Sequence, residues 1–262
     1  MNAFEVLAPG GFTTVQDKGR FGFQQMGVPV CGVLDTFACD TANLLVGNDT
    51  DRAVLEITVM GPSLKFLTPM DIAVTGAKMQ MTLNDRPTEQ WRSIRVKPGD
   101  VLTISQVQAG CRACLAVTGG IKVPSVMGSC STYVGGGFGG FMGRPLTAGD
   151  ILDAHGGDLL TRERVVPETL IPDYPSHVLL RAVPGPQDDF FDQGATTLFT
   201  TRYMVTPKAD RMGYRLQGEK IPIKQGMPKS IVSEPSMPGG IQIPADEQPI
   251  ILLVEQTVGG YA

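Results

Sequence analysis

The sequence predicts a mainly β protein with a few short helices, organised as two β domains. Three observations support this prediction. Apolar and polar residues alternate over many short segments, as they do in strands that bury one face. Glycine (32 residues) and proline (20 residues) make up about 20% of the chain, against an average near 12%, and both residues favour turns. A proline-rich stretch without periodicity, at residues 163–177, divides the chain into two parts.

The first part is expected to consist of short strands separated by turns. Turns are predicted at Asn84-Asp85, at residues 97–100 and at Gly119-Gly120. Strands of this length and spacing are typical of an antiparallel barrel or sandwich. The strands are predicted at residues 53–59, 63–67, 70–75, 78–83, 101–107 and 112–118.

Two helices are predicted. Asp35 can cap the first, which buries apolar residues on one face and ends at Gly47. The second is short and covers residues 187–192, because Pro186 and the acidic residues after it favour a helix start.

Strand signals resume at residues 177–183, beyond the proline-rich stretch. We therefore expect a first β domain at residues 1–162, a linker at 163–177 and a second β domain at 178–262.

Composition excludes several classes of function. The net charge is −4 and no basic stripe exists, so nucleic-acid binding has no electrostatic basis. The longest apolar run, residues 250–254, is far too short to span a membrane as a helix. Residues 1–5 lack the pattern of a signal peptide, and five cysteines are an odd number that fits free thiols. We expect a soluble cytoplasmic protein.

Two short motifs are interpreted structurally. Residues 135–140 match G-x-G-x-x-G, but residues 141–145 cannot start the long helix that a dinucleotide site needs, so a flexible loop that closes over a ligand is favoured. Cys111 and Cys114 have C-x-x-C spacing within a predicted strand, which directs their side chains to opposite faces. With only two histidines in the chain, no metal site is predicted.

Three polar clusters have two interpretations. They comprise residues 128–133 with Arg144, residues 209–215, and a spread set of Ser233-Glu234, Gln242 and residues 255–257. Serine, aspartate and glycine are ordinary turn residues. Arginine among amides and hydroxyls would also suit a planar ligand that carries a carboxylate or an amide. From chemistry alone the two interpretations are equally good.

These clusters belong to a set of motifs through which the chain resembles the carboxyltransferase-domain family. That family includes the C subunit of bacterial 5-oxoprolinase (the KipI antagonist KipA), allophanate hydrolase subunit 2 and the carboxyltransferase part of urea amidolyase. The matching motifs are residues 13–20 (TTVQDKGR), 27–29 (GVP), 42–48 (ANLLVGN), 123–129 (VPSVMGS), 131–133 (STY), 139–141 (GGF), 143–146 (GRPL), 184–187 (PGPQ), 210–216 (DRMGYRL), 233–234 (SE), 240–242 (GIQ) and 256–261 (QTVGGY).

The resemblance implies two cyclophilin-like β-barrel domains and a small amide substrate. It also implies a partner similar to KipI or to the B subunit of 5-oxoprolinase, and a LamB/YcsF-like A subunit. No cofactor is expected on this chain alone, while ATP or carboxybiotin would act through partner subunits. Asp210 and Glu234 are the candidate acid or base. The candidate substrate-binding residues are Arg211, Arg144, Tyr214, Gln242, Gln256, Ser129 and Ser131.

The favoured activity is that of the C subunit in an ATP-dependent 5-oxoprolinase, which cleaves the cyclic amide of 5-oxoproline to glutamate. The alternatives are a biotin-dependent carboxyltransferase for urea or another amide, and a non-enzymatic antagonist of a KipI-like kinase inhibitor. Two departures from the family stand out. Cys130 takes the place of the usual arginine, which weakens the expectation of carboxyl transfer, and members continue past Tyr261, so the second domain is expected to be truncated.

Overall fold

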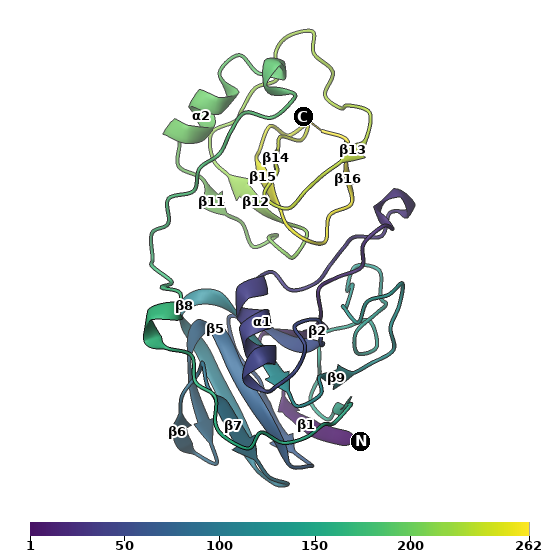
Figure 1. Ribbon diagram of the computed structural model, residues 1–262. Coiled ribbons are helices and arrows are strands. Elements are labelled where there is room, and N and C mark those ends of the chain that lie inside the picture. The colour runs from purple at the N-terminus through teal and green to yellow at the C-terminus, as the bar shows by residue number, and fades with distance from the viewer. Residues whose placement is uncertain (262) are drawn as a thin grey trace. The chain divides into compact units, whose positions relative to one another are not determined.

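The computed structural model describes residues 1–261, and the predicted mainly β fold is confirmed: 34% of the chain is strand and 10% is helix. By their internal contacts, the residues form two units (Figure 1). The first unit contains residues 1–20 and 31–178, and the second contains residues 21–30 and the chain from 179 onward.

The first unit is built on a ten-stranded antiparallel sheet that curls into a nearly closed barrel. Its main path runs β2-β3-β8-β4-β1-β10-β9, and β5 pairs with β6, β7 and β8. The strands are β1 (Asn2–Ala8), β2 (Phe12–Gln16), β3 (Val54–Thr58), β4 (Ser63–Phe66), β5 (Met70–Leu83), β6 (Arg86–Thr88), β7 (Ser93–Val96), β8 (Val101–Val117), β9 (Ile121–Lys122) and β10 (Ile151–Ala154).

The centre of this sheet is the pairing of two long strands, β5 and β8. Each was predicted as two short strands, at residues 70–75 and 78–83 for β5 and at residues 101–107 and 112–118 for β8. The structure keeps each strand continuous and places the irregularity in the register, which shifts around Lys78 and Met79. Such shifts are β-bulges, which bend a strand without ending it.

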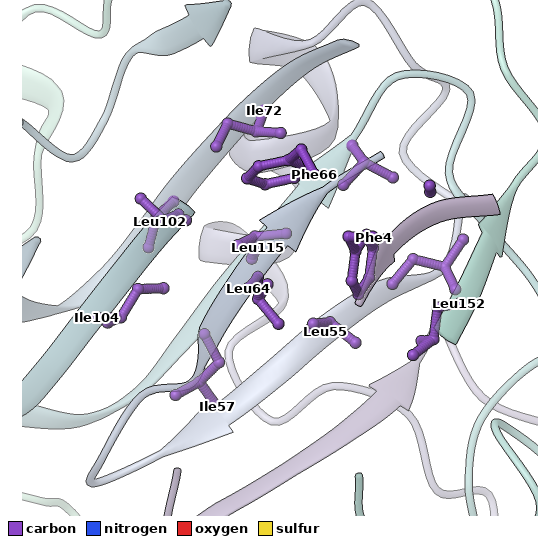
Figure 2. Close-up of a cluster of buried hydrophobic side chains, with 14 of the residues drawn as sticks. Phe4, Leu55, Ile57, Leu64, Phe66, Ile72, Leu102, Ile104, Leu115 and Leu152 are labelled. Atoms are coloured by element: carbon purple, nitrogen blue, oxygen red, sulfur yellow. The ribbon is translucent and has the colours of Figure 1, made fainter. Parts of the chain in front are cut away.

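The barrel encloses the main hydrophobic core (Figure 2). Figure 2 shows Phe4 of β1, Phe66 of β4 and Leu115 of β8 among the side chains that converge there. All three are fully buried, and the rings of Phe4 and Phe66 meet edge to face with centroids 6.1 Å apart. Aromatic pairs favour this geometry, so the core is specifically packed as well as apolar.

Helix α1 (Thr36–Leu45) confirms the first predicted helix. The Asp35 carboxylate accepts a hydrogen bond from the backbone N–H of Ala38 at 2.9 Å, as an N-cap does. The backbone N–H of Gly47 donates to the Leu44 carbonyl, and Gly47 has φ +83°, which favours glycine. The buried face of α1 forms a second small core with residues of β5 and β8.

The segment 163–177, predicted as a linker, is bonded to the first unit. The backbone N–H of Val166 donates to the Trp91 carbonyl at 2.9 Å, and the Arg92 guanidinium binds Glu163 at 2.5 Å. Farther on, the Tyr174 hydroxyl donates to Asp35 at 3.1 Å. The segment contains one 3-10 helix (Glu168–Leu170) and forms part of the first unit.

The second unit contains shorter strands and looser packing. Its sheets have the orders β11-β12-β15-β14 and β13-β16. Helix α2 (Gly194–Thr200) was not predicted from the sequence, and the helix predicted at 187–192 is a 3-10 turn (Asp188–Phe190). A further 3-10 turn covers Gln24–Met26. The strands are β11 (Met204–Val205), β12 (Gly213–Gln217), β13 (Glu234–Pro235), β14 (Ile241–Gln242), β15 (Ile250–Leu252) and β16 (Val258–Gly259).

The strand predicted at residues 177–183 is wrong. The segment has no strand pairing, and Leu179 and Val183 are 93% and 87% exposed. Alternating apolar and polar residues show that a segment could lie on a sheet. A strand forms only if a neighbouring strand also hydrogen-bonds to its backbone. Among residues 1–261, no helix is long and apolar enough to cross a membrane.

Candidate functional site

The candidate site residues are divided between the two units. Ser129, Ser131 and Arg144 belong to the first unit, and the remaining six belong to the second. Each group is described within its own unit.

Ser129 and Ser131 hold a buried carboxylate that was not among the sequence-predicted site residues. Asp17 follows β2, and its Oδ1 accepts hydrogen bonds from the Ser129 and Ser131 hydroxyls, both at 2.6 Å. Its Oδ2 accepts from the Cys130 backbone N–H, also at 2.6 Å. The two serine hydroxyls therefore bind the protein itself in this structure. Asp17 could have been found because it lies in the motif at residues 13–20.

Arg20 is the second residue that sequence reasoning missed. Its side chain is fully buried, and its Nη2 donates to the Ser131 carbonyl. The guanidinium lies 5.2 Å from the centre of the Phe138 ring, within the range of a cation–π interaction. Its Nη1 has no hydrogen-bond partner within residues 1–261. A cation therefore lies beside Asp17 and the serine loop.

The glycine-rich run at residues 135–140 packs against this cluster. Gly139 has φ +72°, and a Cβ atom there would come within 2.7 Å of Arg20 Nη2. Tyr133 and Phe138 form a β-bridge across the run, and their rings lie 5.5 Å apart. The run is a tight turn against Arg20, and no α-helix follows it within the first unit's described residues.

Cys130 lies at the edge of the same cluster. Partial burial raises the pKa of its thiol, and the negative charge of Asp17 adds to the rise, while Arg20 opposes it. A thiol whose pKa is raised is a weak nucleophile at neutral pH. The protonated thiol is neutral, whereas an arginine at this position would carry a positive charge.

Arg144 forms a bidentate ion pair with Asp150. Its Nη1 and Nη2 bind the two carboxylate oxygens of Asp150 at 2.7 and 2.8 Å. The hydrogen bond from Arg144 lowers the pKa of the Asp150 carboxyl, and the Thr147 backbone N–H contributes to the same shift. The guanidinium fork predicted to orient a substrate carboxylate already holds a protein carboxylate.

In the second unit, Arg211 forms a buried ion pair. Its Nε donates to Glu255 Oε1 at 2.6 Å, and the backbone N–H of Glu255 donates to the Arg211 carbonyl at 3.1 Å. Arg211 is only 4% exposed, and Gln256, the residue after Glu255, is 7% exposed. Tyr214 is half-buried on β12, opposite Ile251 of β15.

Asp210 serves the turn that leads into β12. Its Oδ1 accepts hydrogen bonds from the backbone N–H groups of Met212 and Gly213, at 2.8 and 3.1 Å. This is the local bonding through which aspartate stabilises turns. Asp210 is exposed, but one of its carboxylate oxygens is committed to the backbone.

Glu234 and Gln242 are brought together around β16. Glu234 pairs with Gly259 across β13 and β16, and its Oε1 accepts from the Gln187 side-chain amide at 3.0 Å. The Gln242 amide donates to the Tyr261 carbonyl at 3.3 Å. Four separate motifs thus meet at one place: 184–187, 233–234, 240–242 and 256–261. An exposed carboxylate beside two side-chain amides can accept, hold or deliver a proton next to a bound amide.

Within residues 1–261, no group of histidine, cysteine, aspartate or glutamate side chains could hold a metal ion. A cavity of about 620 Å³ lies in the first unit, between β7 and residues 160–163. None of the predicted site residues lines it. Arg95 and Asp71 on its wall are bonded to each other at 2.6 Å.

Comparison with known proteins gives one consistent family. The family model described as "Carboxyltransferase domain, subdomain A and B" matches residues 26–262. The chain is 39% identical to the C subunit of 5-oxoprolinase from Escherichia coli and 34% identical to that from Haemophilus influenzae, each over 98% of this chain and 82% of the relative. It is 37% identical to urea amidolyase of Lachancea kluyveri, over 83% of this chain and 13% of the relative.

Solved structures show the same likeness. A crystal structure of TTHA0988 covers the whole chain with a TM-score of 0.87 and 32% identity, and the chain spans about half (51%) of that protein. The Kluyveromyces lactis urea amidolyase covers 99% of the chain with a TM-score of 0.89 and 33% identity, and the match spans 17% of that enzyme.

Proposed function

The chain belongs to the carboxyltransferase-domain family, and from this premise we propose that it is the C subunit of an ATP-dependent 5-oxoprolinase. Extent of alignment carries the proposal. The C subunits of 5-oxoprolinase align with 98% of this chain and over 82% of their own length. The urea amidolyases align with 83% of this chain. The sequence alignment to the C subunits of 5-oxoprolinase therefore covers more of this chain than the alignment to the urea amidolyases does.

In this proposal the chain works only with partner subunits. A KipI-like or B-type subunit and a LamB/YcsF-like A-type subunit would complete the complex, and ATP would be bound by a partner. This chain would contribute contacts to the lactam substrate and a proton carrier. The names of the two bacterial relatives, which describe a subunit, support an assembly of this kind.

Glu234 is the better of the two candidate proton carriers. Opening a lactam adds water to the carbonyl carbon, breaks the C–N bond and delivers a proton to the leaving nitrogen. One carboxylate oxygen of Asp210 already accepts hydrogen bonds from two backbone N–H groups. Glu234 is exposed, and among residues 1–261 its side chain bonds only the neutral amide of Gln187. Gln242 lies close enough to share the same ligand, while Arg211, Arg144 and Gln256 stay predictions as ligand contacts.

Carboxyl transfer to urea is the second candidate function. The observation that favours it is the 37% identity to the urea amidolyase of Lachancea kluyveri, together with the TM-score of 0.89 to a related urea amidolyase structure. Urea is also a small planar amide, so the same Glu234 and Gln242 groups would suit it. In that case carboxybiotin would come from a partner protein.

Reconstitution distinguishes the two functions. The chain would be combined with its B-type and A-type partners, and glutamate formed from 5-oxoproline would be measured with and without ATP. In parallel, carboxylation of urea would be measured with a carboxybiotin-bearing partner. We expect ATP-dependent glutamate formation that requires this chain and falls at least ten-fold in Glu234→Gln, since loss of general acid–base catalysis costs about 10²–10⁴ in rate. Urea carboxylation without glutamate formation would favour the second function.

A further inference from the structure

Gly259 lies where the polar groups around β16 converge. It is directly opposite Glu234 in the antiparallel pair of β13 and β16. In such a pair, the side chains of opposite residues lie on the same face, with Cβ atoms about 4.5–5.5 Å apart. Because Gly259 has no side chain, the backbone leaves an open position on the Glu234 side of this ribbon.

The side chain of Gln242 fills that position. A Cβ atom on Gly259 would overlap Gln242 Nε2 and would lie 2.7 Å from Ser236 Oγ, closer than real Cβ atoms come. Gly259 is buried, yet it is not among the glycines with positive φ. Its backbone would accept any residue, so the glycine provides space for the Gln242 amide.

We propose that Gly259 is a positioning residue, which lets the Gln242 amide stand beside Glu234 as a donor–acceptor pair for a cis-amide. A lactam ring holds its N–H and C=O on one edge. Glu234 Oε2, which has no partner within residues 1–261, accepts from the N–H, and the second Gln242 amide hydrogen donates to the C=O. This inference rests on the proposed function, because the ligand is taken to be a lactam such as 5-oxoproline.

The neighbouring glycine provides a matched control. A Cβ atom on Gly260 would lie 3.5 Å from Ser233 Oγ and 3.8 Å from the Ile231 carbonyl, which are ordinary contacts. Gly260 also lies outside the set of positive-φ glycines. Alanine at 260 therefore adds the same atom one residue away without displacing Gln242. Alanine at 259 meets only the far ends of flexible side chains, so that variant is expected to fold.

The first experiment tests the positioning without any partner protein. The full chain is labelled with ¹⁵N, and the side-chain amide signal of Gln242 is identified by its loss in Gln242→Ala. We expect Gly259→Ala to shift this signal and Gly260→Ala to leave it in place. An unmoved Gln242 signal in Gly259→Ala would overturn the inference, whatever the substrate is.

A rescue variant tests the same inference if Gly259→Ala lowers the stability of the protein. Asparagine is one methylene shorter than glutamine and withdraws from an added Cβ atom. The double variant Gly259→Ala/Gln242→Asn is therefore expected to melt at a higher temperature than Gly259→Ala alone. In the control, Gln242→Asn in the wild-type chain is expected not to raise the melting temperature. Equal melting of the two variants would show that Gln242 does not occupy the position.

The second experiment uses the reconstituted complex. Gly259→Ala is expected to raise the KM for 5-oxoproline about ten-fold, with kcat within two-fold, and Gly260→Ala to change neither constant. Gln242→Ala should raise KM to a similar degree, and the double variant Gly259→Ala/Gln242→Ala should add nothing further. If the wild-type complex does not cleave 5-oxoproline, the proposed function fails, and the amide signal and melting results still decide the role of Gly259.

Discussion

At the scale of single residues, the side chains predicted to contact a ligand differ in the protein groups to which they are already hydrogen-bonded. The guanidinium of Arg144 and the hydroxyls of Ser129 and Ser131 hold carboxylates of the protein, at 2.6–2.8 Å. Glu234 and Gln242 instead bond an amide and a main-chain carbonyl near the surface of their unit. A ligand can compete for such bonds more readily than for a two-pronged ion pair, which has stronger charge-assisted bonds.

The Arg211–Glu255 ion pair yields a stability prediction. Arg211→Met removes the guanidinium from a carboxylate that is only 7% exposed, and breaking a buried ion pair costs about 3–5 kcal/mol. Urea denaturation should therefore show the second unit unfolding at a clearly lower denaturant concentration. Arg215→Met is the control, because Arg215 is exposed on β12, four residues after Arg211, and surface substitutions usually stay within about 0.5 kcal/mol. Equal midpoints for the two variants would contradict this account.

The Arg144–Asp150 pair yields a pH prediction. Arg144 lowers the pKa of Asp150 in the folded protein, so the pair contributes stability above the pKa of an unfolded aspartate, about 3.9. That contribution is lost as the pH falls through the lowered folded pKa. Wild type should be more stable than Asp150→Asn at pH 7, and the difference should shrink below about pH 4.

Denaturation midpoints of the two proteins at several pH values measure this difference. Arg144→Gln should show the same flattened acid dependence, because it removes the other half of the pair. A difference that stays constant as the pH falls well below 4 would show that the charge on Asp150 contributes nothing to stability.

At the scale of elements, the sequence predicted local features better than pairings. Asp35 and Gly47 marked the ends of α1 because a cap depends on residues three or four positions away. The 177–183 segment has a strand-like pattern as well, but whether a strand forms depends on a neighbour that periodicity cannot reveal. The merging of β5 and β8 into long strands likewise depends on their mutual pairing.

The same limit applies to the candidate site. Glu234 and Gln242 were chosen by residue type and by family motif, and both lie together beside β16. Asp17 and Arg20 were missed as site residues, since the hydrogen bond from Ser129 to Asp17 spans 112 positions in the chain. Gly259 stood out only as part of a motif, because the space that a missing side chain leaves is visible only in three dimensions.

At the scale of the whole molecule, the chain is expected to associate with a B-type partner. Its second unit exposes several large apolar side chains, among them Leu180 and Val232 at 77% and 91%. A binding partner can bury such side chains, and removing apolar surface from water favours association. Co-expression followed by size-exclusion chromatography should give one peak that contains both proteins at micromolar concentration. Separate elution of two well-folded proteins would contradict the expectation.

The second unit is discontinuous in the chain: residues 21–30 belong to it, although residues 31–178 that follow them belong to the first unit. During synthesis these ten residues leave the ribosome roughly 150 residues before the remainder of their unit. At about 5–20 residues per second, that interval lasts about 7–30 seconds. The first unit can fold during this time. Residues 21–30 cannot yet pack, because the other residues of the second unit have not been synthesised. The order of synthesis therefore lets the first unit fold before the second. The second unit can fold only after the residues from 179 onward have left the ribosome.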